Sequence, residues 1–248
     1  MGSEMCIRDR IFRILTPLSP ADRELLSTYG AQHDFIIRLQ PKGPDSIVPL
    51  DQTSADLSYR LTDQHLDLGF LPGDFTQVNS SINRRMINQA LSLLAPSPTD
   101  NVLDLFCGVG NFTLPLAQQA ATVVGVEGDQ GLVQRARQNA VRNQITNTDF
   151  FTANLYETLA PAHWLNQRYQ KALLDPPRSG AQQILAQLPA LGIQQILYIS
   201  CYPSTLARDA GELVHEHGYQ LVSAGVMDMF PHTAHVESIA LFTRPNPV

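Results

Sequence analysis

From residue 80 onward, apolar residues alternate between helical spacing and short continuous runs, as in a protein built from helices and strands in turn. Residues 82–94 carry apolar side chains every three or four positions, which predicts a helix that ends before Pro96. The same reasoning predicts helices at 112–120, 130–143 and 203–217, and strands at 102–106, 122–126, 149–152, 172–174 and 195–200. This alternation predicts a doubly wound α/β sheet. Two final strands, 220–225 and 236–243, have only a loop between them, so we expect them to pair antiparallel at one edge.

In residues 11–75 the pattern of apolar and polar positions differs from that of the α/β part. Short alternating runs predict strands at 35–39, 57–61 and 66–70, and Pro41, Gly43, Pro44 and Pro49 mark turns between them. The segment is too short for a convincing core of its own, and we interpret it as part of a β-rich domain whose remainder is missing. Residues 1–10, MGSEMCIRDR, resemble an assembly scar, and we expect them to lie outside the fold. The α/β domain is expected to occupy residues 76–248.

Composition narrows the class of protein. The 248 residues are 44% hydrophobic and 16% charged, which fits a globular protein with a sizeable core. No apolar run reaches the length of about 18 residues typical of a membrane helix, and no secretory signal is visible. The three cysteines form no C-x-x-C pair and no zinc spacing, so a disulfide framework is excluded and a cytoplasmic, reducing compartment is expected. A formal net charge of −6 excludes a strongly basic protein that coats nucleic acid, although local basic patches are not excluded.

The first predicted strand of the α/β domain runs into a glycine turn. Asp104 lies in the strand, and Gly108 and Gly110 follow, so the local pattern is D-x-F-x-G-x-G. Two glycines at this place let the backbone approach a ligand closely. A dinucleotide fingerprint would need a third glycine where Thr113 stands, so the pattern favours a nucleoside cofactor of the S-adenosylmethionine type over NAD. A glycine-rich turn without any ligand is the alternative.

Polar residues follow the next predicted strands, where ligands of open α/β sheets bind. Glu127 lies about 20 residues past the glycine turn and offers two acceptor oxygens, which match a ribose diol. Asn154 can both donate to and accept from an adenine edge, and Asp175 precedes two prolines that stiffen its loop. The structural alternatives are a solvated acid for Glu127, an ordinary loop asparagine for Asn154 and a rigid turn for the segment after Asp175.

Two further strand ends carry reactive groups. Cys201 precedes Pro203, which suits the first turn of a helix, and a helix N-terminus lowers the pKa of a thiol. Cys201 is therefore a candidate nucleophile, although a small buried hydrophobic residue is the alternative on spacing alone. Between the last two strands, Glu237 is a candidate general base. His232 and His235 lie nearby, but without a fourth ligand at recognisable spacing a metal site is the weaker interpretation, and a polar connection between strands is a third.

Four segments, DLFCGVGNFTL, LLDPPRSG, SCYPSTLARD and MDMFPHTAHVES, resemble the RNA uracil-C5 methyltransferases, and within that family DMFPHT resembles the branch that modifies bacterial 23S ribosomal RNA. The resemblance implies that Cys201 is the nucleophile and Glu237 the general base. It also implies a set of residues that contact S-adenosylmethionine: Gln77, Phe106, Asn111, Glu127, Asn154 and Asp175. Related cytosine methyltransferases would have a cysteine in the Asp-Pro-Pro loop, where this chain has Arg178, so uracil is favoured.

The implied reaction forms 5-methyluridine in 23S ribosomal RNA through a covalent bond between Cys201 and C6 of the base. The family also has an N-terminal RNA-binding β-barrel and a four-cysteine iron–sulfur cluster, and neither has a counterpart here, so no metal is expected. We expect a cytoplasmic monomer without a membrane or protein partner. The alternatives are the same chemistry on transfer RNA, a non-catalytic fragment that binds S-adenosylmethionine or RNA, and an NAD-dependent oxidoreductase, which Thr113 disfavours.

Overall fold

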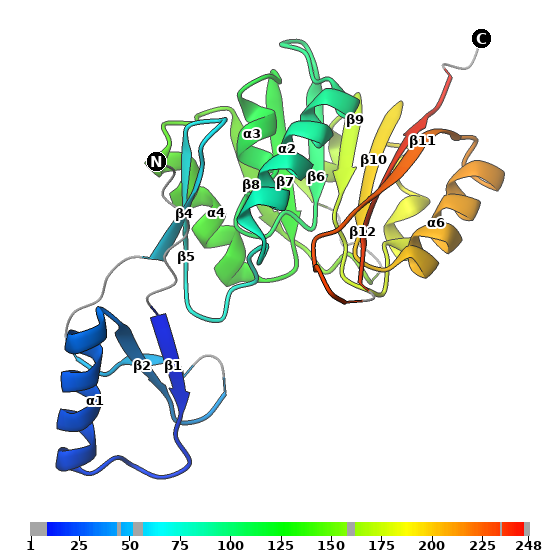
Figure 1. Ribbon diagram of the computed structural model, residues 1–248. Helices are drawn as coiled ribbons and strands as arrows, with labels where there is room; N and C mark the ends of the chain where they lie inside the picture. Colours follow the sequence, from blue (N-terminus) through cyan, green and yellow to red (C-terminus); the bar gives the residue numbers. More distant parts are fainter. Residues whose placement is uncertain (1–8, 44–45, 52–56, 158–161, 234, 246–248) are drawn as a thin grey trace. The chain divides into compact units, whose positions relative to one another are not determined.

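A computed structural model describes residues 9–43, 46–51, 57–157, 162–233 and 235–245 (Figure 1). The chain divides into two compact units. The first comprises the residues up to Tyr59 together with Gly69–Phe75. The second comprises Arg60–Leu68 and everything from Thr76 onward.

The first unit is a three-stranded sheet with one helix. Strands β1 (Asp9–Arg13), β2 (Ile36–Gln40) and β3 (Val48–Pro49) lie in that order, and helix α1 (Pro20–His33) connects the first two. Because β1 and β2 are parallel, their connection has to cross over, which the helix does. Ile37, Leu39 and Leu50 form a small core.

Two predictions about this unit are wrong. Helix α1 was not predicted, because its apolar residues are too scattered to give a helical period. The missed signal is a capping box: Ser19 Oγ accepts from the Asp22 backbone N–H at 3.2 Å, and an Asp22 carboxylate oxygen accepts from the Ser19 backbone N–H. The leader expected at 1–10 also extends too far, because Asp9 lies in β1 and pairs with Arg38 at 2.7 Å. The rest of that leader, 1–8, lies outside the described residues.

The second unit is built on a seven-stranded sheet in the order β11-β12-β10-β9-β6-β7-β8. Its strands are β6 (Asn101–Leu105), β7 (Thr122–Glu127), β8 (Thr148–Thr152), β9 (Lys171–Leu174), β10 (Gln195–Ser200), β11 (Gln220–Met227) and β12 (Glu237–Thr243). Strands β10, β9, β6, β7 and β8 run parallel, and β12 is antiparallel to both of its neighbours. The predicted doubly wound sheet with an antiparallel last strand is confirmed. The sequence did not predict that β12 inserts between β10 and β11.

The central strands β6, β9 and β10 are buried almost throughout, as expected of a sheet that helices cover on both faces. The helical segments are α2 (Ser80–Leu94), α3 (Thr113–Ala117), α4 (Gln130–Arg142), the 3₁₀ turn at His163–Asn166, α5 (Gln182–Leu185) and α6 (Pro203–His215). Helix α2 begins at the cap residue Asn79 and helix α4 at the cap residue Asp129, and both side chains accept hydrogen bonds from backbone N–H groups. The short α5 and the 3₁₀ turn were not predicted. No helix among the described residues is long and apolar enough to cross a membrane.

A hairpin of β4 (Leu57–Leu61) and β5 (Leu66–Phe70) contributes its tip to the second unit. The Asp67 backbone exchanges two hydrogen bonds of 2.8 Å with the side-chain amide of Asn143, the residue that caps the end of α4. Leu66 and Leu68 are buried. Residues before 75 therefore take part in the core of the α/β unit as well as in the first unit.

Candidate active site

The turn after β6 has a backbone that few residues adopt. Phe106, Gly108 and Gly110 have positive φ values of 64°, 54° and 94°. A bulky residue such as Phe106 is seldom found there, and such strain gathers at functional sites. A Cβ atom added to Gly108 would meet nothing within 4 Å, so open space lies beside this part of the turn. The turn can therefore receive a ligand against its backbone.

Glu127, at the end of β7, lies across the same turn. Its Oε2 accepts from the Gly108 N–H at 3.2 Å, and its Oε1 accepts from the N–H groups of Gly128 (2.7 Å) and Asp129 (3.2 Å). These three bonds hold the carboxylate in place and occupy three of its roughly four lone pairs, so that one lone pair remains on Oε2. The side chain is partly exposed, so this remaining acceptor is available to a ribose hydroxyl.

Asn111 is held by a residue that the sequence analysis missed. Its side-chain amide and that of Asn83 exchange two hydrogen bonds of 3.0 Å. Asn83 is only 3% exposed and lies on the apolar face of α2 beside Met86, Ile87 and Ala90. A polar residue on the apolar face of a predicted helix was the signal that could have identified it.

Asp104 is fully buried under the turn. Its Oδ2 accepts from Thr113 Oγ1 at 2.5 Å, and its Oδ1 has no partner among the residues that the structure describes. Burial raises the pKa of Asp104 to about 7, and the negative charge of Glu127 adds to the rise. Thr113, which replaces the third glycine of a dinucleotide fingerprint, thus provides the hydrogen bond that orients this carboxyl.

The raised pKa of Asp104 gives a prediction for stability. The folded protein keeps this proton up to about pH 7, whereas the unfolded chain releases it near the ordinary value of 3.8. Between these values the unfolded state binds fewer protons, so the free energy of unfolding falls as pH rises. We expect Asp104→Asn to remove this contribution, up to about a tenfold change in the unfolding constant per pH unit. Chemical denaturation of both proteins between pH 4 and 8 checks it, and parallel stability profiles would contradict it.

Cys201, Asp175 and Glu237 meet at the carboxyl end of the sheet. Ser200 of β10 pairs with Ser238 of β12, so the chain places Cys201 and Glu237 next to that pair on adjacent strands. Asp175 follows Leu174, which pairs with Tyr198 of β10. Three strands therefore bring together residues that are far apart in the sequence.

The environment of these groups favours their protonated forms. Glu237 is 3% exposed, and burial raises its pKa to about 7. Burial raises the pKa of Asp175 well above its ordinary value, and the charges of Glu237 and Asp104 add to the rise. The predicted lowering of the pKa of Cys201 is wrong: burial raises it, and Glu237 and Asp175 raise it further. Cys201 does lie just before Tyr202, the cap residue of α6, and the raising effects outweigh the positive charge and the hydrogen bond of Arg178, which lower the pKa.

The remaining predicted cofactor residues are placed less directly. Asn154 is exposed and bonds within its own turn, where its Nδ2 donates to Glu157 Oε1 at 2.7 Å and its Oδ1 accepts from the Tyr156 N–H at 3.0 Å. Gln77 is partly exposed and lies two residues before the cap of α2. The ring of Phe106 lies 5.7 Å from that of Tyr156. No sequence signal pointed to Tyr156.

The candidate residues for a metal site do not converge. His232 and His235 are exposed, whereas Glu237 is buried. Within the described ranges no group of three or more histidine, cysteine, aspartate or glutamate side chains is arranged to hold a metal ion. Cys107 is buried, and burial together with nearby negative charge raises the pKa of its thiol well above the ordinary value. It is therefore a packing residue rather than a nucleophile.

Comparisons with known proteins agree with this geometry. Residues 21–245 match the family model described as tRNA (Uracil-5-)-methyltransferase. The chain is 56% identical over 232 residues to the 23S rRNA (uracil(1939)-C(5))-methyltransferase RlmD of Stenotrophomonas maltophilia K279a, covering 94% of this chain and 52% of the relative. The corresponding protein of Xanthomonas axonopodis pv. citri is 55% identical with the same coverage. The chain thus spans about half the length of the curated relatives it matches.

A solved structure shares the fold. The Pyrococcus abyssi tRNA (uracil-54, C5)-methyltransferase, determined in complex with S-adenosyl-L-homocysteine, superposes with a TM-score of 0.73. The two sequences are 24% identical, and the alignment covers 95% of this chain and 55% of the other. This likeness supports the assignment of the α/β unit as a methyltransferase-type sheet.

Proposed function

The chain belongs to the tRNA (uracil-5-)-methyltransferase family, and from that premise we propose that its protein transfers a methyl group from S-adenosylmethionine to C5 of a uridine in 23S ribosomal RNA. The observation that carries the proposal is the meeting of Cys201, Asp175 and Glu237 at the end of three strands beside the glycine turn. The names of relatives more than 50% identical favour ribosomal over transfer RNA.

The residues present fit S-adenosylmethionine. Glu127 offers an acceptor on Oε2 for a ribose hydroxyl, and the space beside Gly108 leaves room for the ligand. Burial raises the pKa values of Asp104 and Asp175, and the charge of Glu127 adds to the first rise while those of Glu237 and Asp104 add to the second. A positively charged ligand would favour their ionised forms, so a sulfonium and an ammonium group complement this site. We propose that four further residues contact the same ligand: Gln77, Phe106, Asn111 and Asn154. When bound, S-adenosylmethionine would supply an electrophilic methyl group.

The proposed chemistry assigns separate tasks to two side chains. C5 of uracil is a weak nucleophile, and addition of the Cys201 thiolate to C6 makes an S–C6 bond and an enolate that is electron-rich at C5. C5 then forms a bond to the methyl carbon as the methyl–sulfur bond of the sulfonium breaks. Glu237 accepts the C5 proton, and the electron pair left at C5 expels the thiolate from C6. Covalent catalysis thereby divides one difficult substitution into easier steps.

The target uridine has to leave its base stack to reach Cys201, at a cost of about a few kcal/mol. The match covers 52% of the first curated relative, so RNA recognition by that relative can also involve residues outside the matched half. A chain that binds S-adenosylmethionine or RNA without turnover is the second candidate. Its distinguishing property would be ligand binding without a covalent intermediate.

Trapping with 5-fluorouridine tests the proposal. The chain is incubated with S-adenosylmethionine and a 23S ribosomal RNA fragment that contains 5-fluorouridine, beside a Cys201→Ala control. Fluorine at C5 cannot leave as a proton does, so the cycle is expected to stop as a covalent, methylated adduct visible by intact-protein mass spectrometry. An adduct with the parent alone supports the assignments of the nucleophile, the target uracil and the methyl donor together. Binding of S-adenosylmethionine without an adduct would favour the non-catalytic alternative, and absence of both would contradict the cofactor assignment.

A further inference from the structure

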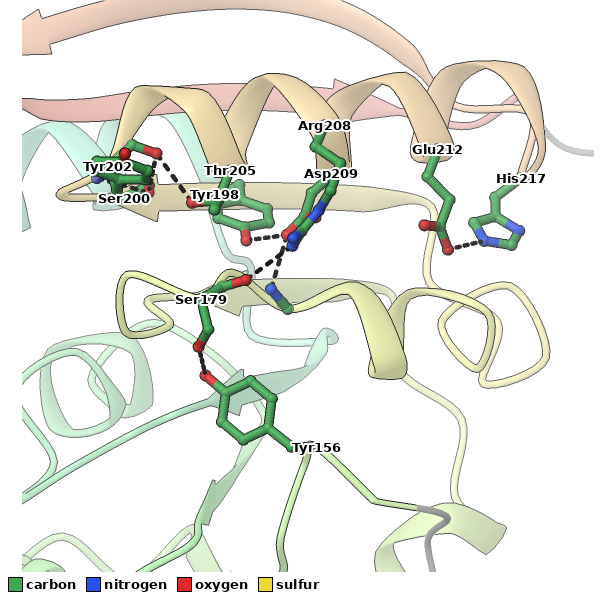
Figure 2. A network of polar contacts seen from close by, with 11 residues as sticks. Tyr156, Ser179, Tyr198, Ser200, Tyr202, Thr205, Arg208, Asp209, Glu212 and His217 are labelled. Atoms are coloured by element: carbon green, nitrogen blue, oxygen red, sulfur yellow. Dashed lines mark hydrogen bonds and ion pairs between the residues drawn. The ribbon is translucent and has the colours of Figure 1, made fainter.

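A buried carboxylate, that of Asp209, lies on α6, the helix that follows the candidate nucleophile. Asp209 has no exposed side-chain surface, and it lies eight residues after Cys201. Its Oδ2 accepts from the Ala181 N–H at 2.7 Å and from the Tyr198 hydroxyl at 2.5 Å (Figure 2). Its Oδ1 accepts from Arg208 Nε at 2.8 Å. A buried charge with this many hydrogen bonds ties together every segment that it contacts.

Those segments surround Cys201. Tyr198 lies in β10, the strand that runs into Cys201, and Ala181 ends the turn that begins with Asp175. Arg208 reinforces the link, because one of its Nη groups donates to the Ser179 carbonyl at 2.8 Å and lies 2.6 Å from Asp209 Oδ1. The helix after the nucleophile is thus bonded directly to the neighbouring loop.

Gly180 permits this close approach. Its φ is +82°, and an added Cβ would lie 2.5 Å from Arg208 Nη2 and 2.6 Å from Asp209 Oδ2. Any side chain would therefore push the ion pair away from the backbone of the turn. The close contact between the turn and the Arg208–Asp209 pair therefore requires glycine at position 180.

The turn also reaches the glycine-loop side of the site. Ser179 Oγ donates to the Tyr156 hydroxyl at 2.9 Å, and the Tyr156 ring packs on Phe106 (Figure 2 shows the Ser179–Tyr156 contact). Arg178 directly precedes Ser179, and both its charge and a side-chain hydrogen bond act on the Cys201 thiol. The position of Arg178 beside Cys201 therefore depends on where the turn is held.

We propose that Arg208 and Asp209 form a positioning clamp on the turn 178–181, and that this clamp keeps the Arg178 guanidinium beside Cys201 Sγ. Neither clamp residue has to touch substrate for this role. If Asp209 served only to anchor α6 on the sheet, its hydrogen bond from Tyr198 of β10 would be sufficient. The additional bonds to Ala181 N–H and the Ser179 carbonyl are directed at the loop instead.

The pH profile of Cys201 alkylation tests the clamp without any RNA substrate. Iodoacetamide reacts with the thiolate, and quantification of the Cys201 peptide by mass spectrometry separates it from the other two cysteines. Besides Arg178, the charged groups that act on this thiol are Glu237 and Asp175. Loss of the clamp should free Arg178 to leave, so Arg208→Ala and Asp209→Asn should each move the alkylation midpoint to higher pH by about one unit.

Three comparisons make the result specific. Arg178→Ala should give the same shift, and adding Asp209→Asn to it should shift the midpoint no further. Arg208→Lys should restore part of the parent profile. Glu212→Gln removes a 3.3 Å contact with His217 one turn further along α6, away from the loop, and should leave the midpoint unchanged (Figure 2).

The side chain of Arg208 is 42% exposed, so Arg208→Ala is expected to fold. If this variant retains its near-ultraviolet circular dichroism and its midpoint does not move, the clamp is refuted. A lower melting temperature without a midpoint shift would likewise leave only a structural role. The proposal rests on the proposed function solely in placing Cys201 at the site of chemistry. A shifted midpoint in a chain that neither binds S-adenosylmethionine nor forms an adduct with RNA would support the clamp and refute the proposed function.

Discussion

Cys201→Ala is expected to lower methyl transfer to uridine by about four orders of magnitude or more, as removal of a covalent nucleophile does in other enzymes. Without the sulfur, C5 must attack the methyl donor from an unactivated ring. Cys201 lies at the end of β10 beside Glu237 and Asp175, and no equivalent nucleophile is available there among the described residues, because Cys107 in the glycine turn is buried. Single-turnover transfer of a radioactive methyl group to RNA measures the effect.

The matched control for this variant is binding of the methyl donor. Alanine removes the reactive atom but leaves Glu127 and the glycine turn intact, so the dissociation constant for S-adenosylmethionine should stay within about twofold. Cys201→Ser keeps a polar group of similar size but supplies a hydroxyl, which ionises far less readily than a thiol, and should be as inactive as alanine. Full activity in either variant would eliminate the covalent mechanism.

Glu237→Gln is expected to lower turnover by about 10² to 10⁴-fold, the usual contribution of a general base. The amide cannot accept the C5 proton, whereas Cys201 and the donor site are unchanged. The reaction should therefore proceed through methyl transfer and stop as an RNA–enzyme adduct that resolves slowly. Denaturing gel electrophoresis of the variant with unmodified RNA detects that adduct, and normal binding of S-adenosylmethionine without an adduct would count against this role.

The pH dependence gives an independent check on Glu237. Because burial raises its pKa to about 7, the fraction that can act as a base increases between pH 6 and 8, and turnover of the parent should rise over that range. Glutamine should remove the part of this rise that Glu237 causes and leave only the part that follows ionisation of the Cys201 thiol. The same shift makes the ionised parent less stable, since the folded carboxyl keeps its proton above the ordinary value of 4.5. Glu237→Gln should thus be the more stable protein at pH 8, which also verifies that its inactivity is not unfolding.

Much of the α/β unit could be predicted from periodicity because its strands and helices are separated by clear changes of period. The sequence predicted β10 with its observed bounds and an antiparallel pair at one edge of the sheet. Helix α1 escaped prediction because only its capping residues, Ser19 and Asp22, mark it, and its apolar positions do not repeat. The tip of the β4–β5 hairpin joined the α/β unit through Asn143, a contact 76 residues away in the chain.

The candidate site divides in the same way. The sequence alone located Glu127, Asp175 and Cys201, because parallel strands present their carboxyl ends at one edge of a sheet. It located Glu237 in the connection between the last two strands, and β12 begins with Glu237 at that same edge because it runs antiparallel to β10. Whether these groups hold or release protons was decided by tertiary structure, since a pKa depends on burial and on charges that arrive from other strands. For the Cys201 thiol, the local expectation from a helix end even had the wrong sign, because Glu237 and Asp175 lie beside it.

The sequence by itself thus determined the order of elements, the glycine turn and the chemical identity of the groups at the strand ends, all of which depend on neighbours within a few residues. Only the tertiary structure decided the insertion of β12, the pairing of Asn83 with Asn111 and the clamp of Asp209 on the turn at Ala181. The two side-chain contacts join residues 28 positions apart, and the pairing of β12 with β10 joins residues 38 or more positions apart. Their free energy comes from burial and hydrogen bonding that exist only once the chain has folded.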